Sequence, residues 1–322
     1  MARPRIVVTR AIPESGIKLL EQDFDVQVYR GEGVMDKAQL CEFVKGAEVI
    51  VSLLTDPIDG EVLDAAGPQL KAVAQYTVGY DNIDLEAAKA RSVIVTHTAG
   101  TLSATAVAEL ALGGLLAVAR HTVQADAYMR SGAYKYWDPS IFLGQQLTGK
   151  TVGIIGTGQI GSLFATMCHH VFRAKILYTD MVSNLSLEKS LGAMKVSKEE
   201  LLARADVVSL HVPLLASTRH LIGEGELQQM KKTAILINTS RGPVVDEGAL
   251  VRALQNREIF GACLDVYESE PDPAEGLAAL DNVVLTPHIA SATETTRTAM
   301  AECVVRNIKA VLAGETPPDL VR

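Results

Sequence analysis

Three side chains in the C-terminal half of the chain are of types that suit acid–base chemistry on an anion. Arg241, Glu270 and His288 each follow a short apolar run that predicts a strand. Arginine presents a planar fork of N–H donors to carbonyl and carboxylate oxygens. Histidine can give a proton to a carbonyl oxygen, and a carboxylate beside it favours the charged imidazolium. Each residue alone is more often solvated or structural, so the chemistry depends on whether the fold brings the three together.

A glycine-rich segment predicts a second site. The β-branched run Thr151–Ile155 predicts a buried strand, and Gly156, Gly158 and Gly161 follow it at G-x-G-x-x-G spacing. Gly156 permits a tight turn, and Gly158 lets a pyrophosphate approach the backbone closely. Gly161 lets the next helix pack closely on the strand. Asp180 ends the next predicted strand, where an acid can accept both ribose hydroxyls of an adenosine. The pattern favours a dinucleotide site over a glycine-rich turn beside a solvated aspartate.

Strands and helices must bring these residues to one place. Short apolar runs alternate with helical patterns, which predicts parallel sheets covered by helices on both faces. Because ligands bind outside the carboxyl ends of such strands, we expect the Arg, Glu and His side chains at the edge that carries the glycine loop. The predicted strands are Ile6–Thr9, Val26–Tyr29, Val49–Leu54, Ala72–Gln75, Val93–Thr96, Thr151–Ile155, Lys175–Thr179, Val207–Leu210, Ala234–Asn238, Ala262–Val266 and Val283–Thr286. The predicted helices are Ser15–Gln22, Lys37–Val44, Glu61–Ala65, Leu85–Ala90, Ser103–Arg120, Ser162–Val171, Lys198–Ala203, Glu224–Met230, Glu247–Gln255 and Ala292–Ala313, the last with a capping box of Ser291 and Glu294.

One loop in the N-terminal third suits the carboxylate of a substrate. Val78 and Gly79 follow a predicted strand and precede a helix capped by Asp84, and a glycine there allows successive backbone N–H groups to point at one anion. A tight turn needed only for folding is the alternative. Leu54 and Trp137 are expected to line the pocket, although the irregular stretch around Trp137 also fits a packed surface loop. A dinucleotide beside arginine, glutamate and histidine suits hydride transfer to a keto acid.

Composition narrows the class of function. A chain of 322 residues is too long for one ordinary core, so two domains are expected. The net charge of −8 argues against nonspecific nucleic-acid binding and against an acidic membrane surface. No signal-peptide pattern opens the chain, and the apolar segment Ala104–Ala119 contains Glu109, which predicts a buried helix and no membrane anchor. The four scattered cysteines predict reduced thiols of a cytosolic protein, and no metal-ligand cluster is expected. The other histidines have no comparable partners in the sequence: His97, His121, His169, His170, His211 and His220.

Six motifs spread over the whole chain are specific when taken together. They are Val78–Asp84, Gly156–Gly161, His211–Leu214, Asn238–Gly242, Leu264–Pro271 and Leu285–His288. They resemble those of the D-isomer-specific 2-hydroxyacid dehydrogenases, and within that family the chain looks most like the glyoxylate/hydroxypyruvate reductases. The second similarity is carried by Val51–Thr55, Phe142–Gly144 with Trp137, Met230–Asn238 and Leu280–Leu285.

The resemblance implies a fold and roles for the three side chains. It implies two doubly wound parallel-sheet domains, with a Rossmann cofactor domain (101–288) inserted in a discontinuous, flavodoxin-like substrate domain (1–100 and 289–322), and an active site in the cleft. Arg241 is then the substrate anchor, His288 the acid/base and Glu270 its partner. The family is typically a homodimer joined through its cofactor domains, and Trp137 is expected to reach the neighbouring subunit's pocket.

The resemblance also implies the cofactor contacts. Many glyoxylate reductases carry a small polar residue followed by arginine where this chain has Asp180 and Met181, so the expected cofactor is NAD(H). The segment beginning at His97 departs from the usual Asn-Thr-Pro version, and Val78 replaces the lysine of phosphite dehydrogenases. The implied contacts are Gly156, Gly158, Gln159, Ile160, Gly161, Asp180, Val212, Pro213, Thr218, Thr239 and Asp265, the last near the nicotinamide amide.

We therefore expect a cytoplasmic enzyme that uses NADH to reduce small 2-keto acids such as glyoxylate and hydroxypyruvate to D-2-hydroxy acids, with His288 as proton donor. Two other functions stay open. A D-3-phosphoglycerate dehydrogenase shares the motifs, although this chain has no extra regulatory domain. A non-enzymatic, NADH-sensing protein like the C-terminal-binding-protein corepressors shares the Arg, Glu and His set, and a turnover assay separates it from an enzyme.

Overall fold

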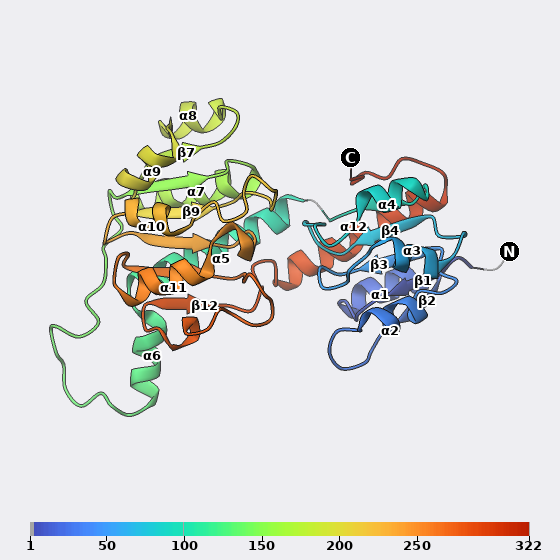
Figure 1. Ribbon diagram of the computed structural model, residues 1–322, viewed down its shortest axis with the longest axis horizontal. Coiled ribbons are helices and arrows are strands. Elements are labelled where there is room, and N and C mark those ends of the chain that lie inside the picture. The colour runs from blue at the N-terminus through green and yellow to red at the C-terminus, as the bar shows by residue number, and fades with distance from the viewer. Residues whose placement is uncertain (1–2, 99, 322) are drawn as a thin grey trace. The chain divides into compact units, whose positions relative to one another are not determined.

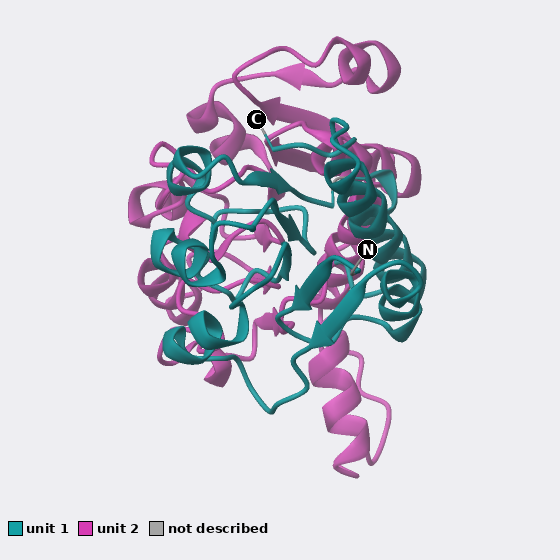
Figure 2. Cartoon of the chain, turned by 90° about the vertical axis from the view of Figure 1, so that its right-hand side faces the viewer, with its two compact units in different colours: residues 1–103, 291–322 teal, residues 104–290 magenta. Residues whose placement is uncertain are grey.

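The computed structural model describes residues 3–98 and 100–321, and the chain forms two compact units (Figure 2). Unit 1 comprises Met1–Ser103 and Ser291–Arg322, and unit 2 comprises Ala104–Ala290. Each unit contains one all-parallel sheet with helices packed on both faces, so the predicted α/β class with two doubly wound sheets is confirmed (Figure 1).

Unit 1 has a five-stranded sheet in the order β2-β1-β3-β4-β5, which is the flavodoxin-like order. Its side chains alternate between two cores: Ile6 packs with helices α1 and α12, and Val7 packs on the opposite face with α2 and α3. The strands are β1 (Arg5–Val8), β2 (Asp25–Val28), β3 (Val49–Ser52), β4 (Ala72–Gln75) and β5 (Ile94–Thr96). The helices are α1 (Glu14–Glu21), α2 (Lys37–Phe43), α3 (Gly60–Ala66), α4 (Leu85–Ala90) and α12 (Glu294–Leu312).

Unit 2 has a seven-stranded sheet in the order β12-β11-β10-β9-β6-β7-β8. The order reverses between β6 and β9, so the carboxyl end of β6 lies at a topological switch point, where dinucleotides bind in this architecture. The strands are β6 (Thr151–Ile155), β7 (Lys175–Thr179), β8 (Met194–Lys195), β9 (Val207–Leu210), β10 (Ile235–Asn238), β11 (Gly261–Leu264) and β12 (Val283–Leu285). The helices are α5 (Thr101–Ala119, which starts in unit 1), α6 (Thr122–Arg130), α7 (Gln159–Phe172), α8 (Leu185–Leu191), α9 (Lys198–Arg204), α10 (Glu224–Gln229) and α11 (Glu247–Gln255), with short 3-10 turns at Gly242–Val244 and Leu277–Ala279.

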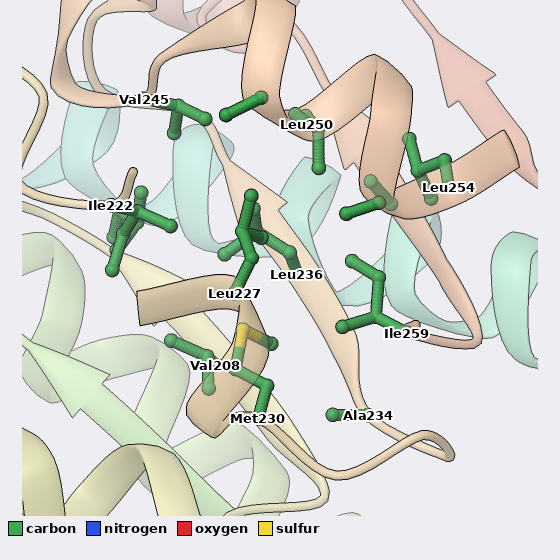
Figure 3. Close-up of a cluster of buried hydrophobic side chains, with 14 of the residues drawn as sticks. Val208, Ile222, Leu227, Met230, Ala234, Leu236, Val245, Leu250, Leu254 and Ile259 are labelled. Atoms are coloured by element: carbon green, nitrogen blue, oxygen red, sulfur yellow. The ribbon is translucent and has the colours of Figure 1, made fainter. Parts of the chain in front are cut away.

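The core of unit 2 fixes the strands that carry the proposed chemistry. On one face, Leu236 of β10 meets Leu227 of α10 and Leu250 of α11, and Figure 3 shows these side chains pointing toward one another. On the other face, Ile237 packs in the cluster that contains Phe164 of α7. Burial on both faces explains why these strands are continuous apolar runs in the sequence.

Helix α5 is long and apolar enough to span a membrane by length and composition alone. Half of it is buried, and Ala108, Leu115 and Val118 belong to the core of unit 2. It is therefore a core helix, as the sequence predicted for this segment.

Two local predictions need correction or addition. Helix α12 does not begin with the predicted capping box of Ser291 and Glu294. Its N-cap is Thr293, whose side chain accepts a hydrogen bond from the N–H of Thr296.

Helices α6 and α8 and the short strand β8 were not predicted. Helix α6 buries no side chain and leads away from the sheet of unit 2, and the irregular stretch after it carries Trp137, which is 75% exposed (Figure 1).

Candidate active site

The glycine loop after β6 has the geometry that its spacing predicted. Gly156 adopts φ +92°, and a Cβ there would lie 2.7 Å from the carbonyl oxygen of His211. A Cβ at Gly161 would clash with the carbonyl oxygen of Gly156, so this glycine lets helix and strand pack closely. Gly158 is the N-cap of α7 and a Cβ there would meet open space, which leaves backbone N–H groups and the helix dipole available to an anion. Helix α7 begins at Gln159, earlier than predicted, so Gln159 and Ile160 lie in its first turn.

Asp180 binds the glycine loop directly. Its carboxylate accepts hydrogen bonds from the N–H of Thr157 at 2.6 Å and from the Thr157 hydroxyl at 2.8 Å. The amide of Asn184 donates to the Thr157 carbonyl at 3.0 Å. Burial alone would raise the pKa of Asp180, but hydrogen bonds from Thr157, Met181 and Val182 outweigh it and hold the pKa below its ordinary value. An ionised acceptor therefore lies beside the loop.

Other residues at this edge also fit a dinucleotide. Thr239 follows β10, and its buried hydroxyl has no hydrogen-bond partner among the described residues, which leaves it for a ligand. Val212 and Pro213 follow β9, and the hydroxyl of Thr218 donates to the carbonyl of Pro213 at 2.7 Å. An open glycine after β6, an ionised acceptor after β7 and an unsatisfied hydroxyl after β10 all lie at the carboxyl edge of one sheet, and together they suit such a cofactor.

His288 and Glu270 form a hydrogen-bonded pair. Nδ1 of His288 lies 2.9 Å and 3.1 Å from the two carboxylate oxygens of Glu270, which also accepts from the N–H of Tyr267 at 3.2 Å. Burial would raise the pKa of Glu270, but the hydrogen bond and charge of His288, the Tyr267 N–H and the charge of Arg241 outweigh it, so the pKa falls below its ordinary value. The pair is thus a carboxylate that accepts Nδ1–H and leaves Nε2 for another partner.

Asp265 holds the turn that carries His288. Its buried carboxylate accepts from the Thr286 hydroxyl at 2.6 Å and from the N–H groups of Ile289 and Ala290, each at 2.8 Å. Burial raises the pKa of Asp265 although these hydrogen bonds oppose the shift. His288 adopts φ +54°, an uncommon conformation for a residue with a Cβ, and the Asp265 contacts on both sides of it sustain that turn.

Arg241 follows β10 in a turn fixed by Asn238. The Asn238 amide donates to the Arg241 carbonyl at 2.8 Å, and its oxygen accepts from the N–H and hydroxyl of Ser240. The guanidinium of Arg241 donates to the Ser240 carbonyl at 2.8 Å, and its charge contributes to the lowered pKa of Glu270. The fold therefore brings Arg241, Glu270 and His288 to one edge of unit 2.

The predicted anion loop lies at the corresponding edge of unit 1. Leu54 follows β3, and Val78 and Gly79 follow β4, with the Val78 side chain 41% exposed. The Asn82 amide ties the two segments together, because it donates to the carbonyls of Leu53 at 3.0 Å and Asp56 at 2.8 Å.

The described residues favour neither a metal-binding site nor a reactive thiolate. Within residues 3–98 and 100–321, no group of three or more His, Cys, Asp or Glu side chains is placed to hold a metal ion. The four cysteines are free thiols, and burial raises the pKa of Cys168, Cys263 and Cys303 to about 12.

Comparison with known proteins decides the family. Residues 112–290 match the family described as D-isomer specific 2-hydroxyacid dehydrogenase, NAD binding domain. The glyoxylate reductase of Korarchaeum cryptofilum is 49% identical over 99% of this chain and 96% of its own. The chain belongs to the D-isomer-specific 2-hydroxyacid dehydrogenases. It is an enzyme similar to glyoxylate reductases, and unit 2 contains its NAD-binding domain.

Solved structures that are similar in sequence to this chain have the same fold. A protein from Thermus thermophilus is 45% identical with a TM-score of 0.92, over 99% of this chain and 100% of that one. The glyoxylate/hydroxypyruvate reductase of Sinorhizobium meliloti, described as NADPH-dependent, is 32% identical with a TM-score of 0.84, over 99% of this chain and 98% of that one.

Sequence reasoning missed Glu247, which shapes the loop that carries Glu270. This buried carboxylate accepts from the N–H of Glu268 at 2.7 Å and the N–H of Ala274 at 2.9 Å, one on each side of Glu270. Burial raises its pKa against these hydrogen bonds. The two partners of Glu247 are backbone groups far along the chain, so the pattern of side chains in the sequence does not indicate these contacts. The neighbouring Asp246 caps α11, since its carboxylate accepts from the N–H of Ala249 at 2.8 Å.

Two other histidines lie near this edge. His220 Nε2 lies 2.9 Å from the Glu268 carboxylate, so the prediction that His220 has no comparable partner is wrong. His211 Nε2 lies 2.9 Å from the Ser209 hydroxyl, and burial lowers the pKa of His211 to about 3. A histidine that stays neutral at ordinary pH cannot serve as the proton donor, which leaves His288 as the better candidate.

Proposed function

We propose that this dehydrogenase reduces glyoxylate and hydroxypyruvate to the D-2-hydroxy acids with NADH, in the cytoplasm. One observation carries the proposal: His288 is hydrogen-bonded to Glu270 at the carboxyl edge of an NAD-binding sheet, with Arg241 at the same edge. The names of its relatives support the substrate class, because the similar enzyme of Korarchaeum cryptofilum is a glyoxylate reductase.

Each residue has a defined role in this proposal. The amides around Gly158 and the carboxylate of Asp180 would hold the pyrophosphate and the adenosine ribose of NADH, which when bound supplies a hydride to the carbonyl carbon. Arg241 directs its N–H groups at the carbonyl and carboxylate oxygens of the substrate. His288 gives the proton on Nε2 to the carbonyl oxygen, and Glu270 stabilises the imidazolium before the transfer. His288 is left neutral and regains a proton from solvent.

The substrate assignment can be tested with a panel of keto acids. The roles proposed for Arg241 and for the Val78 and Gly79 amides provide for one carboxylate, and no residue is proposed to bind a phosphate of the substrate. We predict that two- and three-carbon keto acids have a higher kcat/KM with NADH than 3-phosphohydroxypyruvate has. A higher value for the phosphorylated substrate would favour a phosphoglycerate dehydrogenase, and absence of turnover with every keto acid would favour an NADH-sensing binding protein.

Cofactor preference tests Asp180. Its carboxylate should bond the ribose hydroxyls and repel a 2′-phosphate, so we predict that NADH is preferred over NADPH by about 1–3 kcal/mol in kcat/KM. Asp180→Ser should reduce that preference, and Asp281→Ser, at an exposed aspartate that pairs with Arg257, should leave it unchanged. Equal kcat/KM values for NADH and NADPH in the wild type would rule out this role.

The pH profile tests the proton donor. Reduction needs protonated His288, so the single-turnover rate should be high at low pH and fall as His288 loses its proton, while oxidation of the hydroxy acid should show the opposite dependence. Against the effect of burial, hydrogen bonding to His288 holds the pKa of Glu270 below its ordinary value and places a carboxylate beside Nδ1, so Glu270→Gln should move the reductive midpoint to lower pH. His288→Ala should lower kcat by roughly 10²–10⁴.

The matched control is His170→Ala, at an exposed histidine of α7. It should change neither the pH midpoint of reduction nor kcat. An unchanged midpoint in Glu270→Gln, or near-normal kcat in His288→Ala, would mean that another group is the acid.

We also propose a homodimer in which Trp137 reaches the neighbouring subunit's substrate. Helix α6 buries no side chain within its own unit, and Tyr136, Trp137 and Leu143 in the stretch after it are 75%, 75% and 70% exposed. Exposed apolar side chains grouped in this way mark interaction surfaces. Sedimentation velocity at micromolar concentration should give a dimer, and a monomer there would contradict the proposal.

A further inference from the structure

The imidazole of His97 holds the loop that is proposed to bind the substrate's carboxylate. His97 follows β5, and its Nδ1 lies 2.8 Å from the carbonyl oxygen of Val78. A carbonyl oxygen can only accept, so Nδ1 carries the hydrogen and donates it. The ring also packs edge-on against Tyr80, with ring centroids 5.4 Å apart and an interplanar angle of 89°. Both contacts act on the same short loop.

The next carbonyl of the loop is held from the other side. The Gly79 oxygen accepts from the Thr77 hydroxyl at 2.7 Å and from the Gln75 amide at 3.3 Å. Gln75 is itself fixed, because its oxygen accepts from the Ser52 hydroxyl at 2.6 Å and its amide donates to Asn82 at 2.8 Å. Two successive peptide groups are therefore held by side chains.

Holding these carbonyls also orients the N–H groups of the loop. In a trans peptide the N–H points opposite to the C=O, so the contact from His97 to the Val78 carbonyl fixes the direction of the Gly79 N–H. Within the described part of the chain, no group accepts a hydrogen bond from the N–H of Val78 or from the N–H of Gly79. Gly79 does not have positive φ, so a left-handed backbone conformation is not what orients these N–H groups.

The backbone of His97 is anchored as well. Its N–H donates to the Asp319 carbonyl at 3.1 Å, and its carbonyl accepts from the Asn307 amide at 3.3 Å. The N–H of Thr98 donates to the Thr77 carbonyl at 2.9 Å. Helix α12 and the segment after it thus fix the residue whose side chain fixes the loop.

We propose that His97 is a positioning residue that sets affinity for the substrate's carboxylate through the peptide between Val78 and Gly79. The inference rests on the proposed function, in which these amides receive the carboxylate. His97 touches the loop and is assigned no contact with the reacting atoms. Its loss should therefore weaken binding of the anion and leave the hydride and proton steps intact.

Two substitutions separate the hydrogen bond from ring packing. His97→Phe keeps an aromatic ring against Tyr80 and removes the donor, whereas His97→Asn keeps a donor and removes the ring. We expect His97→Phe to raise KM for glyoxylate by roughly 3- to 10-fold, the size of one net hydrogen bond, with little change in kcat or in KM for NADH. His97→Asn should recover most of the wild-type KM, and His170→Phe on exposed α7 should have no effect.

A second readout does not depend on turnover. Binding of oxamate, an unreactive anion with the same carboxylate, to the NADH complex should weaken in His97→Phe by the same factor as KM rises. Two results would overturn the role of the hydrogen bond. One is a His97→Phe variant that keeps the wild-type KM and oxamate affinity, and the other is an equal loss of oxamate affinity in His97→Phe and His97→Asn.

If the wild type did not reduce glyoxylate, the proposed function would fail, while the oxamate comparison would still decide the role of His97. His97→Ala replaces His97→Phe in both comparisons if the latter does not fold.

Discussion

The chemistry proposed for unit 2 depends on one contact, the hydrogen bond from His288 Nδ1 to the Glu270 carboxylate at 2.9 Å. Its two members lie on different segments, and each segment is held by its own buried acid. Asp265 accepts from both sides of His288, and Glu247 accepts from both sides of Glu270. In the proposed reaction, the contact engages Nδ1 and leaves Nε2 for the substrate, so it fixes the orientation and the tautomer of the ring.

The two units contribute different chemistry. Unit 2 contains the NAD-binding domain, and it carries the guanidinium of Arg241 and the proposed proton donor. In unit 1, His97 holds the Val78 carbonyl and so fixes the direction of the Gly79 N–H, which together with the Val78 N–H is proposed to receive the substrate's carboxylate. A chain with a net charge of −8 needs such local donors to attract an anion. Because these N–H dipoles are fixed before binding, they need no reorganisation when the anion binds.

The sequence predicts most of this fold because buried parallel strands are continuous apolar runs. The bounds of β4, β6, β7 and β9 and of α4 and α11 agree with prediction, and strand polarity alone places Arg241, Glu270 and His288 at one edge. Helices α6 and α8 were missed because they bury few side chains: α6 buries none and α8 buries only Leu187 among its described residues. The cap of α12 was misplaced because Ser291 and Thr293 both suit an N-cap. The contacts of Glu247 and His97 were not predicted because their partners are backbone groups distant in the sequence, which only the folded chain brings close.

A double-mutant cycle tests the central contact most directly. Single-turnover reduction would be measured at one pH for the wild type, Glu270→Gln, His288→Ala and the double variant. If Glu270 acts through His288, Glu270→Gln lowers the rate in the wild type and has almost no further effect when His288 is already absent. If the two losses instead multiply in the double variant, Glu270 and His288 act independently and the paired acid proposed here is wrong.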